Sequence, residues 1–245
     1  MKKLKKKNKN KLNIYLKMES STITSSKNIN DEICDPNLYY EKTLGTTIVA
    51  VVYSGGVMLA ADARTSSGQY VANRVADKIW PITSNIFALK CGSAADTQFL
   101  LQTTKGYMAQ FGVEYGDKPP VKVAARLLQQ FQYQYKNYLN CAVIVCGYDN
   151  LEGASIYEVG MGGTVTKRII AMNGSGSHYI NGYVDKHFKE NMTKEEAKEF
   201  LKNAVTLAMF RDSHSGGIIR ILDITKDGFN REYIPYKDIK FPNMP

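Results

Sequence analysis

The sequence predicts an α+β fold: two stacked antiparallel sheets with helices on both outer faces. Three observations support this prediction. Short apolar runs rich in β-branched residues predict strands, apolar residues at helical spacing predict helices, and the two kinds alternate as strands, two helices, strands, two helices, strands. With 245 residues, 44% hydrophobic and 22% charged, the chain is long enough to bury a substantial core. The predicted architecture is a four-layer αββα sandwich.

The first predicted elements form a β-hairpin that begins just after residue 45. Two apolar, β-branched runs cover residues 47–53 and 57–63, and Ser54-Gly55-Gly56 between them is typical of a tight turn. Residues 86–91 form another apolar run of strand length. The amino-terminal half of the fold is therefore expected to begin with strands.

Two helices are predicted next, separated by the Pro119-Pro120 pair. Each helix is predicted from apolar residues that share one helical face. The first face carries Ala94, Leu101, Met108 and Phe111, and the second carries Ala124, Leu127, Leu128, Phe131, Tyr135 and Tyr138.

The second half of the chain repeats the order of strands and helices. Strands are predicted at residues 141–148, 154–159 and 168–172, followed by two helices. Thr193 and Glu196 have the spacing of a capping box at the start of the second helix. The core face of that helix carries Ala197, Phe200, Ala204 and Ala208. Strands at 217–223 and 229–234 complete the fold.

A basic, polar leader precedes the folded region. Residues 1–45 hold ten Lys and five Asp or Glu, so the remaining 200 residues hold 22 basic and 18 acidic side chains. Residues 1–40 are rich in Lys, Asn, Ser and Thr, a composition that favours disorder. The Lys run is typical of a solvated tail, with a nuclear-targeting or acidic-partner role as the alternative. Two regions are therefore expected, 1–45 as leader and 46–245 as domain.

Several classes of protein are excluded by missing patterns. The four cysteines form no C-x-x-C pair, which favours structural thiols in a reducing compartment over disulfides or metal ligands. No segment is apolar for long enough to predict a membrane span. Gly174-Ser175-Gly176 lacks the third glycine of a dinucleotide fingerprint, because Tyr179 occupies its place. No cofactor, metal or membrane is expected, and the predicted location is the cytoplasm and nucleus.

The most informative pattern begins at Gly45-Thr46, where the leader meets the first strand. Taken alone it indicates only a strand start, since threonine favours strands. Further along the chain, Asp62 and Arg64 end the second strand, Lys78 closes the run Asn73–Lys78, and a Gly-Ser step lies in Cys91–Asp96.

Together with the hairpin and the run Arg211–Gly217, these motifs resemble a catalytic proteasome beta subunit. The stretches Ser93–Gln98 and Met161–Gly163 are most similar to the caspase-like, or post-acidic, subunit. The resemblance covers about residues 46–234. It implies the N-terminal-nucleophile hydrolase fold, in agreement with the layered prediction. It also implies that the chain cuts itself between Gly45 and Thr46, removing residues 1–45.

The resemblance assigns a role to each residue of the site. A free Thr46 supplies the nucleophilic hydroxyl and, through an α-amino group with an ordinary pKa of about 7.7–8.0, the base. Asp62 and Lys78 are placed beside Thr46, although an ordinary ion pair is the alternative for these two. The supports of the amino group are Ser175, Asp212 and Ser215, and the backbone N–H of Gly92 is assigned to the oxyanion.

The resemblance also indicates a substrate pocket. Lys90 falls at its base, where a cation favours Glu or Asp before the cut bond. The caspase-like subunit usually has Arg there, and lysine lacks the bidentate fork. Trp80 is a second departure, since a smaller residue is usual, and the alternative for Trp80 is a packing residue. Thr65, Ser66 and Ala94 complete the predicted pocket.

The predicted protein is thus a threonine endopeptidase that cuts after acidic residues. Its expected partners are alpha and beta subunits in stacked seven-membered rings, and its expected substrates are unfolded, usually ubiquitin-tagged polypeptides. One alternative is a non-catalytic structural beta subunit, which would lack one of the motifs that this chain retains. Another is nucleic-acid binding by the Lys-rich leader, which would be removed on maturation. No nucleic acid is therefore expected as a partner.

Overall fold

The protein is represented by a computed structural model that describes residues 45–67, 70–115 and 118–242. The predicted leader, residues 1–45, lies outside the described residues except for Gly45, and so does Cys34. From Gly45 onward, the described residues fall within one compact unit.

The first sheet has five antiparallel strands in the order β10-β1-β2-β11-β12. Strand β1 pairs with β2 as the predicted hairpin, in which Tyr53 faces Gly56 across a two-residue turn. The strands are β1 (Ile48–Tyr53), β2 (Gly56–Ala61), β10 (Ile170–Asn173), β11 (Ile219–Thr225) and β12 (Gly228–Ile234).

The second sheet is also antiparallel, with its five strands in the order β5-β6-β7-β8-β9. These are β5 (Ile79–Pro81), β6 (Ile86–Gly92), β7 (Cys141–Asp149), β8 (Gly153–Val159) and β9 (Val165–Arg168). A separate two-stranded ribbon consists of β3 (Thr65–Ser67) and β4 (Tyr70–Asn73). The ribbon leads from the end of β2 towards β5.

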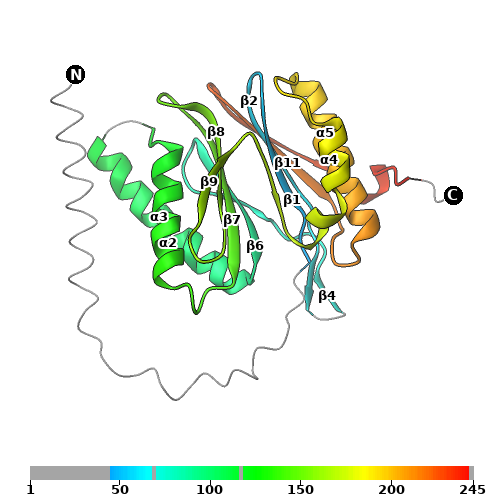
Figure 1. Cartoon of the computed structure of the whole chain (residues 1–245), viewed down its shortest axis with the longest axis horizontal. Helices are drawn as coiled ribbons and strands as arrows, with labels where there is room; N and C mark the ends of the chain where they lie inside the picture. The colour runs from blue at the N-terminus through cyan, green and yellow to red at the C-terminus, as the bar shows by residue number, and fades with distance from the viewer. Residues whose placement is uncertain (1–44, 68–69, 116–117, 243–245) are drawn as a thin grey trace, which may run out of the picture. The chain divides into compact units, whose positions relative to one another are not determined.

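Helices cover the outer face of each sheet, which confirms the predicted αββα layers (Figure 1). Helices α2 (Ala94–Tyr115) and α3 (Val121–Gln134) pack on the second sheet. Helices α4 (Asn181–His187) and α5 (Lys194–Arg211) pack on the first. Short 3₁₀ turns lie at η2 (Ser175–Tyr179) and η3 (Tyr236–Asp238).

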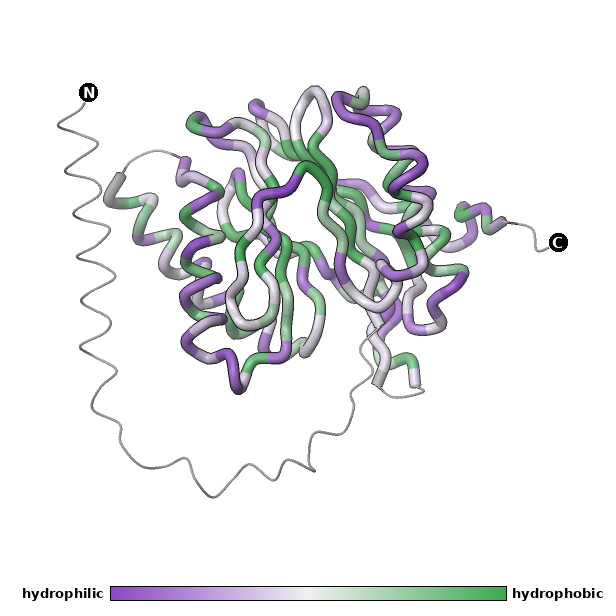
Figure 2. Tube along the Cα trace, in the orientation of Figure 1, coloured by the Kyte–Doolittle hydropathy of each residue, from purple (hydrophilic) through white to green (hydrophobic). Residues whose placement is uncertain are grey.

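The hairpin strands are apolar on both faces because both faces are buried. On β1, Val49 and Val51 point to the core beneath α4 and α5, whereas Ile48 and Ala50 point to the core between the sheets. Successive residues of a strand face opposite sides, so a continuous apolar run suits a strand enclosed by two layers. Figure 2 shows hydrophobic residues gathered along the strands, with hydrophilic residues on the outer sides of the helices.

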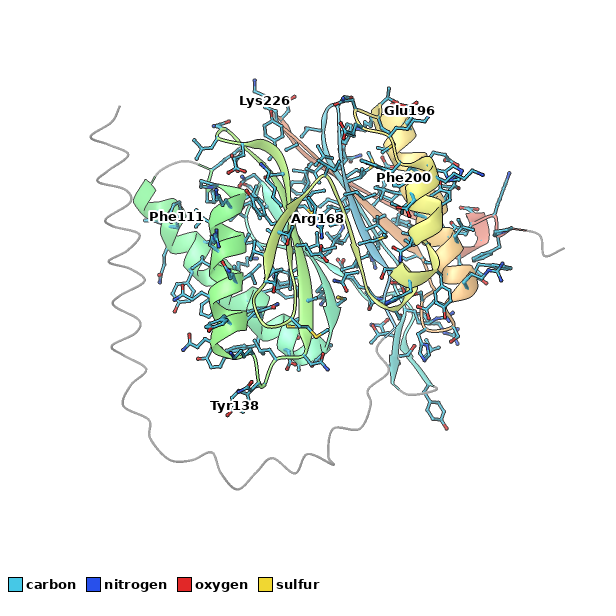
Figure 3. The ribbon with its side chains drawn as sticks, in the orientation of Figure 1. Phe111, Tyr138, Arg168, Glu196, Phe200 and Lys226 are labelled. Carbon is cyan, nitrogen blue, oxygen red and sulfur yellow. The ribbon has the colours of Figure 1, made fainter. Side chains whose placement is uncertain are left out.

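The predicted capping box of α5 is confirmed. The Thr193 hydroxyl accepts from the Glu196 backbone N–H at 3.2 Å, and the Glu196 carboxylate accepts from the Thr193 N–H at 2.8 Å. The predicted core face of this helix is buried, and Phe200 on it is labelled in Figure 3. The predicted face of α3 extends too far, because the helix ends at Gln134 and Tyr138 lies beyond it with 57% of its surface exposed.

The predicted strand at residues 168–172 corresponds to β10, but its start is wrong. The chain crosses between the two sheets within it: β9 ends at Arg168 in the second sheet and β10 begins at Ile170 in the first. The carbonyl of Ile169, between them, accepts from the Val52 N–H of the first sheet at 2.8 Å. No glycine or proline interrupts the apolar run at this point, so its pattern resembles that of one continuous strand.

The three described cysteines are free and buried, as predicted for structural thiols. Within the described ranges, no helix has the length and apolar character needed to cross a membrane. Over the same ranges, no group of His, Cys, Asp and Glu side chains is arranged to hold a metal ion.

Candidate active site

Thr46 is buried two residues before the start of β1, with 5% of its surface exposed. Its carbonyl accepts from the Gly176 N–H at 3.2 Å. This close approach explains two glycines of the run that resembles a dinucleotide motif. A Cβ on Gly174, whose φ is +93°, would lie 2.1 Å from the Thr46 carbonyl oxygen, and a Cβ on Gly176 would lie 1.9 Å from the Thr47 hydroxyl.

The Asp62 carboxylate is fully buried at the end of β2 and is saturated with donors. One oxygen accepts from the Lys78 ammonium at 2.6 Å and the Thr47 N–H at 2.8 Å. The other accepts from the N–H groups of Arg64 at 3.1 Å and Gly216 at 3.0 Å. Four donors from separate parts of the chain fix this carboxylate in one position, so its charge can orient Lys78.

The Lys78 ammonium joins Asp62 to the Gly45–Thr46 peptide bond. It donates to the Gly45 carbonyl oxygen at 3.0 Å, and the Thr46 hydroxyl donates to the same oxygen at 2.6 Å. Burial lowers the pKa of Lys78, while the neighbouring Asp62 carboxylate opposes that shift. The nucleophile and a cation therefore meet on the carbonyl of the bond predicted to be cut.

A second polar cluster surrounds the Thr46 nitrogen. The Thr46 N–H donates to the Ser175 hydroxyl at 3.2 Å, which donates to Asp212 at 2.7 Å. The Ser215 hydroxyl donates to the same Asp212 oxygen at 2.6 Å. The structure thus brings together Ser175, Asp212 and Ser215, as the resemblance implied, along a path suited to proton movement at the Thr46 nitrogen.

Asp212 stays ionised although it is buried at the C-terminal end of α5. Burial alone would raise its pKa, but hydrogen bonds from Ser215, Ser175 and the His214 N–H outweigh burial and hold the pKa below its usual value. A permanent negative charge can therefore stabilise positive charge near the Thr46 nitrogen.

Gly92 ends β6 with a φ of +96°. A Cβ there would lie 2.5 Å from the Asn140 carbonyl oxygen, so the turn itself requires glycine. The predicted role of its N–H towards an oxyanion stays a prediction.

The predicted pocket residues lie on the elements next to this cluster. The Lys90 N–H donates to the Lys78 carbonyl at 3.1 Å, which sets Lys90 beside Lys78. Its ammonium lies 5.2 Å from the centroid of the Trp80 ring. Ser66 is buried and Thr65 partly buried on the ribbon, whereas Ala94 is exposed at the start of α2. Within the described ranges, no hydrogen bond joins these five side chains to Thr46, so their substrate roles stay predictions.

Two contributors were missed by the sequence analysis. The Thr47 hydroxyl lies 2.7 Å from that of Ser215, while its N–H bonds Asp62, so Thr47 links the two polar clusters. The backbone of His214 packs against Gly45, where a Cβ would lie 2.0 Å from the His214 carbonyl oxygen. Thr47 could have been found from its place beside Thr46, but His214 contacts Gly45 only in the folded chain.

Two helix-covered antiparallel sheets carry a buried threonine that cleavage of the preceding bond would turn into a chain terminus. This combination defines the class of N-terminal-nucleophile hydrolases.

Comparisons with known proteins agree. The family described as Proteasome subunit matches residues 42–224. "Probable proteasome subunit beta type-1" of Schizosaccharomyces pombe is 48% identical over 79% of this chain and 85% of its own length. "Proteasome subunit beta type-6" is 48% identical in Dictyostelium discoideum, over 78% of this chain and 90% of the relative. The protein of that name in Arabidopsis thaliana is 44% identical, over 82% of this chain and 86% of the relative.

The chain belongs to the proteasome subunit family. The resemblance to a catalytic beta subunit of the caspase-like type is thereby confirmed, and with it the enzyme class, a threonine peptidase. Membership in this family also means assembly with other proteasome subunits.

Proposed function

We propose that this chain matures by cutting its own Gly45–Thr46 bond and then cleaves polypeptides after acidic residues. The observation that carries the proposal is the Gly45 carbonyl oxygen, which accepts hydrogen bonds from both the Thr46 hydroxyl and the Lys78 ammonium. A nucleophile and a cation on one carbonyl are the elements that amide cleavage requires.

In the maturation step the Thr46 hydroxyl oxygen attacks the Gly45 carbonyl carbon, closing a five-membered ring. The C–O bond forms, the C–N bond breaks, and the hydroxyl proton ends on the Thr46 nitrogen. Lys78, 3.0 Å from the carbonyl oxygen, stabilises the negative charge that develops there. Water then hydrolyses the resulting ester, leaving a carboxylate on Gly45 and a free Thr46.

The mature Thr46 then acts on substrates by the same chemistry. Its amino group takes the hydroxyl proton as the oxygen attacks a substrate carbonyl, and it returns the proton to the leaving amine. An amide nitrogen cannot act as this base, so maturation switches the site on. Ser175 and the ionised Asp212 stabilise the amino group as it becomes charged.

Charge complementarity supports the preference for acidic residues. Lys90 is adjacent to Lys78 through a backbone hydrogen bond, and no carboxylate of the described residues lies within ion-pair distance of its ammonium. A half-buried cation that forms no ion pair among the described residues favours the carboxylate of a substrate Glu or Asp. Thr65, Ser66 and Ala94 complete the proposed pocket.

The proposed setting is a particle of stacked seven-membered rings of alpha and beta subunits, in the cytoplasm and nucleus, which degrades unfolded, ubiquitin-tagged proteins. Its support is family membership, which implies assembly with other proteasome subunits.

The first test is the intact mass and N-terminal sequence of this subunit from the native particle. The expected N-terminus is Thr46. An N-terminus upstream of Thr46 in the assembled particle would leave no free amine and would refute the proposal.

The second test measures specificity with peptides that carry Glu, Tyr or Arg before a fluorescent leaving group. Because other subunits also cleave peptides, particles carrying Thr46→Ala in this chain are the matched control. The activity missing from the control belongs to this chain, and it is expected to be greatest for Glu. If the activity missing from the control is instead greatest for the Tyr peptide, the acidic preference is overturned.

A further inference from the structure

Trp80 and Lys90 lie on neighbouring strands and form one unit. Trp80 on β5 pairs with Ala88 on β6, and Lys90 follows two residues later on the same face. Diagonal neighbours of this kind are within reach of long and aromatic side chains. The ammonium of Lys90 lies 5.2 Å from the centroid of the Trp80 ring, within the range of a cation–π interaction.

The ring is the partner that the structure gives to the Lys90 charge. Among the described residues, no acidic side chain forms an ion pair with Lys90. Asp77, the acidic residue that influences Lys90 electrostatically, is bound by Arg231. Burial lowers the pKa of Lys90 and outweighs the opposing effect of the Asp77 charge.

Trp80 is itself held by packing. It packs against the core formed by the second sheet with α2 and α3, and its buried indole N–H has no hydrogen-bond partner among the described groups. A tryptophan fixed by packing presents a rigid surface to the ammonium. Lysine alone has a flexible stem of four carbons, so the ring decides where its charge lies.

We propose that Trp80 is a specificity-determining positioning residue, whose ring holds the Lys90 ammonium so that its free side meets the carboxylate of a substrate Glu or Asp. The proposal rests on the proposed function and deepens it. Trp80 acts through Lys90 and need not touch substrate. It fills the space beside a slender lysine and replaces, by one aromatic contact, the orientation that a planar guanidinium would provide through its fork.

The test compares assembled particles carrying Trp80→Leu, which removes the aromatic face, with particles carrying Trp80→Phe, which retains one. Each is assayed with matched Glu and Gln peptides, because the two side chains differ in charge and hardly in shape. Activity of Thr46→Ala particles is subtracted. The readout is the ratio of kcat/KM for Glu to that for Gln, which cancels any general loss of active particles.

Trp80→Leu is expected to lower this ratio about tenfold, mainly through a higher KM for the Glu peptide, and Trp80→Phe to lower it about threefold or less. Equal ratios in the Leu and Phe variants, or a wild-type ratio in the Leu variant, would overturn the inference. The proposed function fails separately if the wild-type particle itself has no preference for Glu over Gln.

Discussion

A single side chain, Lys78, connects the charge network of the site to the bond that we propose is cut. Its ammonium bonds both Asp62 and the Gly45 carbonyl oxygen. The sequence alone could predict Asp62 and Lys78 because each stands in a recognisable motif. It could not predict that both polar clusters meet at Thr47, since that depends on chain segments that become neighbours only on folding.

We predict that removing the Lys78 charge blocks maturation. Lys78→Met alone would leave Asp62 buried and unpaired, at a cost of about 3–5 kcal/mol, so the informative variant is Asp62→Asn/Lys78→Met. Its rate of cleavage before Thr46 is expected to fall by roughly 10²–10³. The measurement is the intact mass of this subunit in assembled particles over time. Maturation of the double variant at the wild-type rate would show that the cation is not needed.

Gly45 is a second residue whose local geometry is expected to control the rate of maturation. A Cβ there would lie 2.0 Å from a backbone oxygen of His214, which cannot move aside as a side-chain end can. Gly45→Ala is therefore expected to shift the scissile carbonyl away from Lys78 and to slow maturation at least tenfold in the same mass assay. Gly106→Ala is the matched control, because a Cβ on Gly106 meets nothing within 4 Å. Equal maturation rates of the two variants would contradict the prediction.

Among the helices, α5 matters most for the site, because Asp212 caps its C-terminal end. Its start was predictable, since the Thr193 and Glu196 capping box is a local pattern. The crossing from β9 to β10 was not predictable, because Arg168, Ile169 and Ile170 include no glycine or proline that would indicate a turn. Only the folded structure shows that β9 and β10 belong to different sheets. Local patterns thus predicted helix starts and hairpins better than exchanges between sheets.

We predict that Thr193→Ala lowers the free energy of unfolding by about 1 kcal/mol, because it leaves an N–H at the start of α5 without its acceptor. Thr193→Ser retains the hydroxyl and is expected to restore most of the loss. Urea unfolding of the purified chain can be followed by the fluorescence of Trp80, the only tryptophan. Thr164→Ala, at an exposed turn position, serves as the control. Identical stability of the Thr193 Ala and Ser variants would exclude the capping hydrogen bond as the cause.

The folded chain buries three thiols. Cys91 and Cys146 lie in the core between the two sheets, and Cys141 lies in the core beneath α2 and α3. The layered fold could be predicted from alternating groups of strands and helices. Burial of the cysteines followed from their apolar surroundings. The separate ribbon β3–β4 and the short strand β5 could not be predicted, because each is only three or four residues long.

These thiols predict that the fold loses stability in alkali. Burial raises the pKa of Cys91 from 9.0 to about 11 and that of Cys141 to about 12, and it raises the pKa of Cys146 strongly. Below pH 9 the thiols are protonated in both the folded and the unfolded chain. Between about pH 9 and 11 only the unfolded chain loses protons, so stability falls as pH rises, by about 1.4 kcal/mol per thiol per pH unit.

Urea unfolding at pH 8, 9 and 10 measures this slope. Cys146→Ala is expected to make the fall in the free energy of unfolding between pH 9 and 10 shallower by up to about 1.4 kcal/mol per pH unit. The slope is compared, and not the stability itself, because the smaller side chain also changes packing. A slope unchanged by the substitution would mean that Cys146 does not contribute to alkaline destabilisation.

The hydrogen bonds on the Gly45 carbonyl also bear on how many leaders each particle releases. In the proposed maturation, the first bond that Thr46 cuts belongs to the same chain. The first turnover is then unimolecular: its rate is independent of concentration, and free peptides compete with it poorly. Each chain can perform that turnover once. The number of released leaders therefore equals the number of active threonines, which makes the leader a built-in count of working sites.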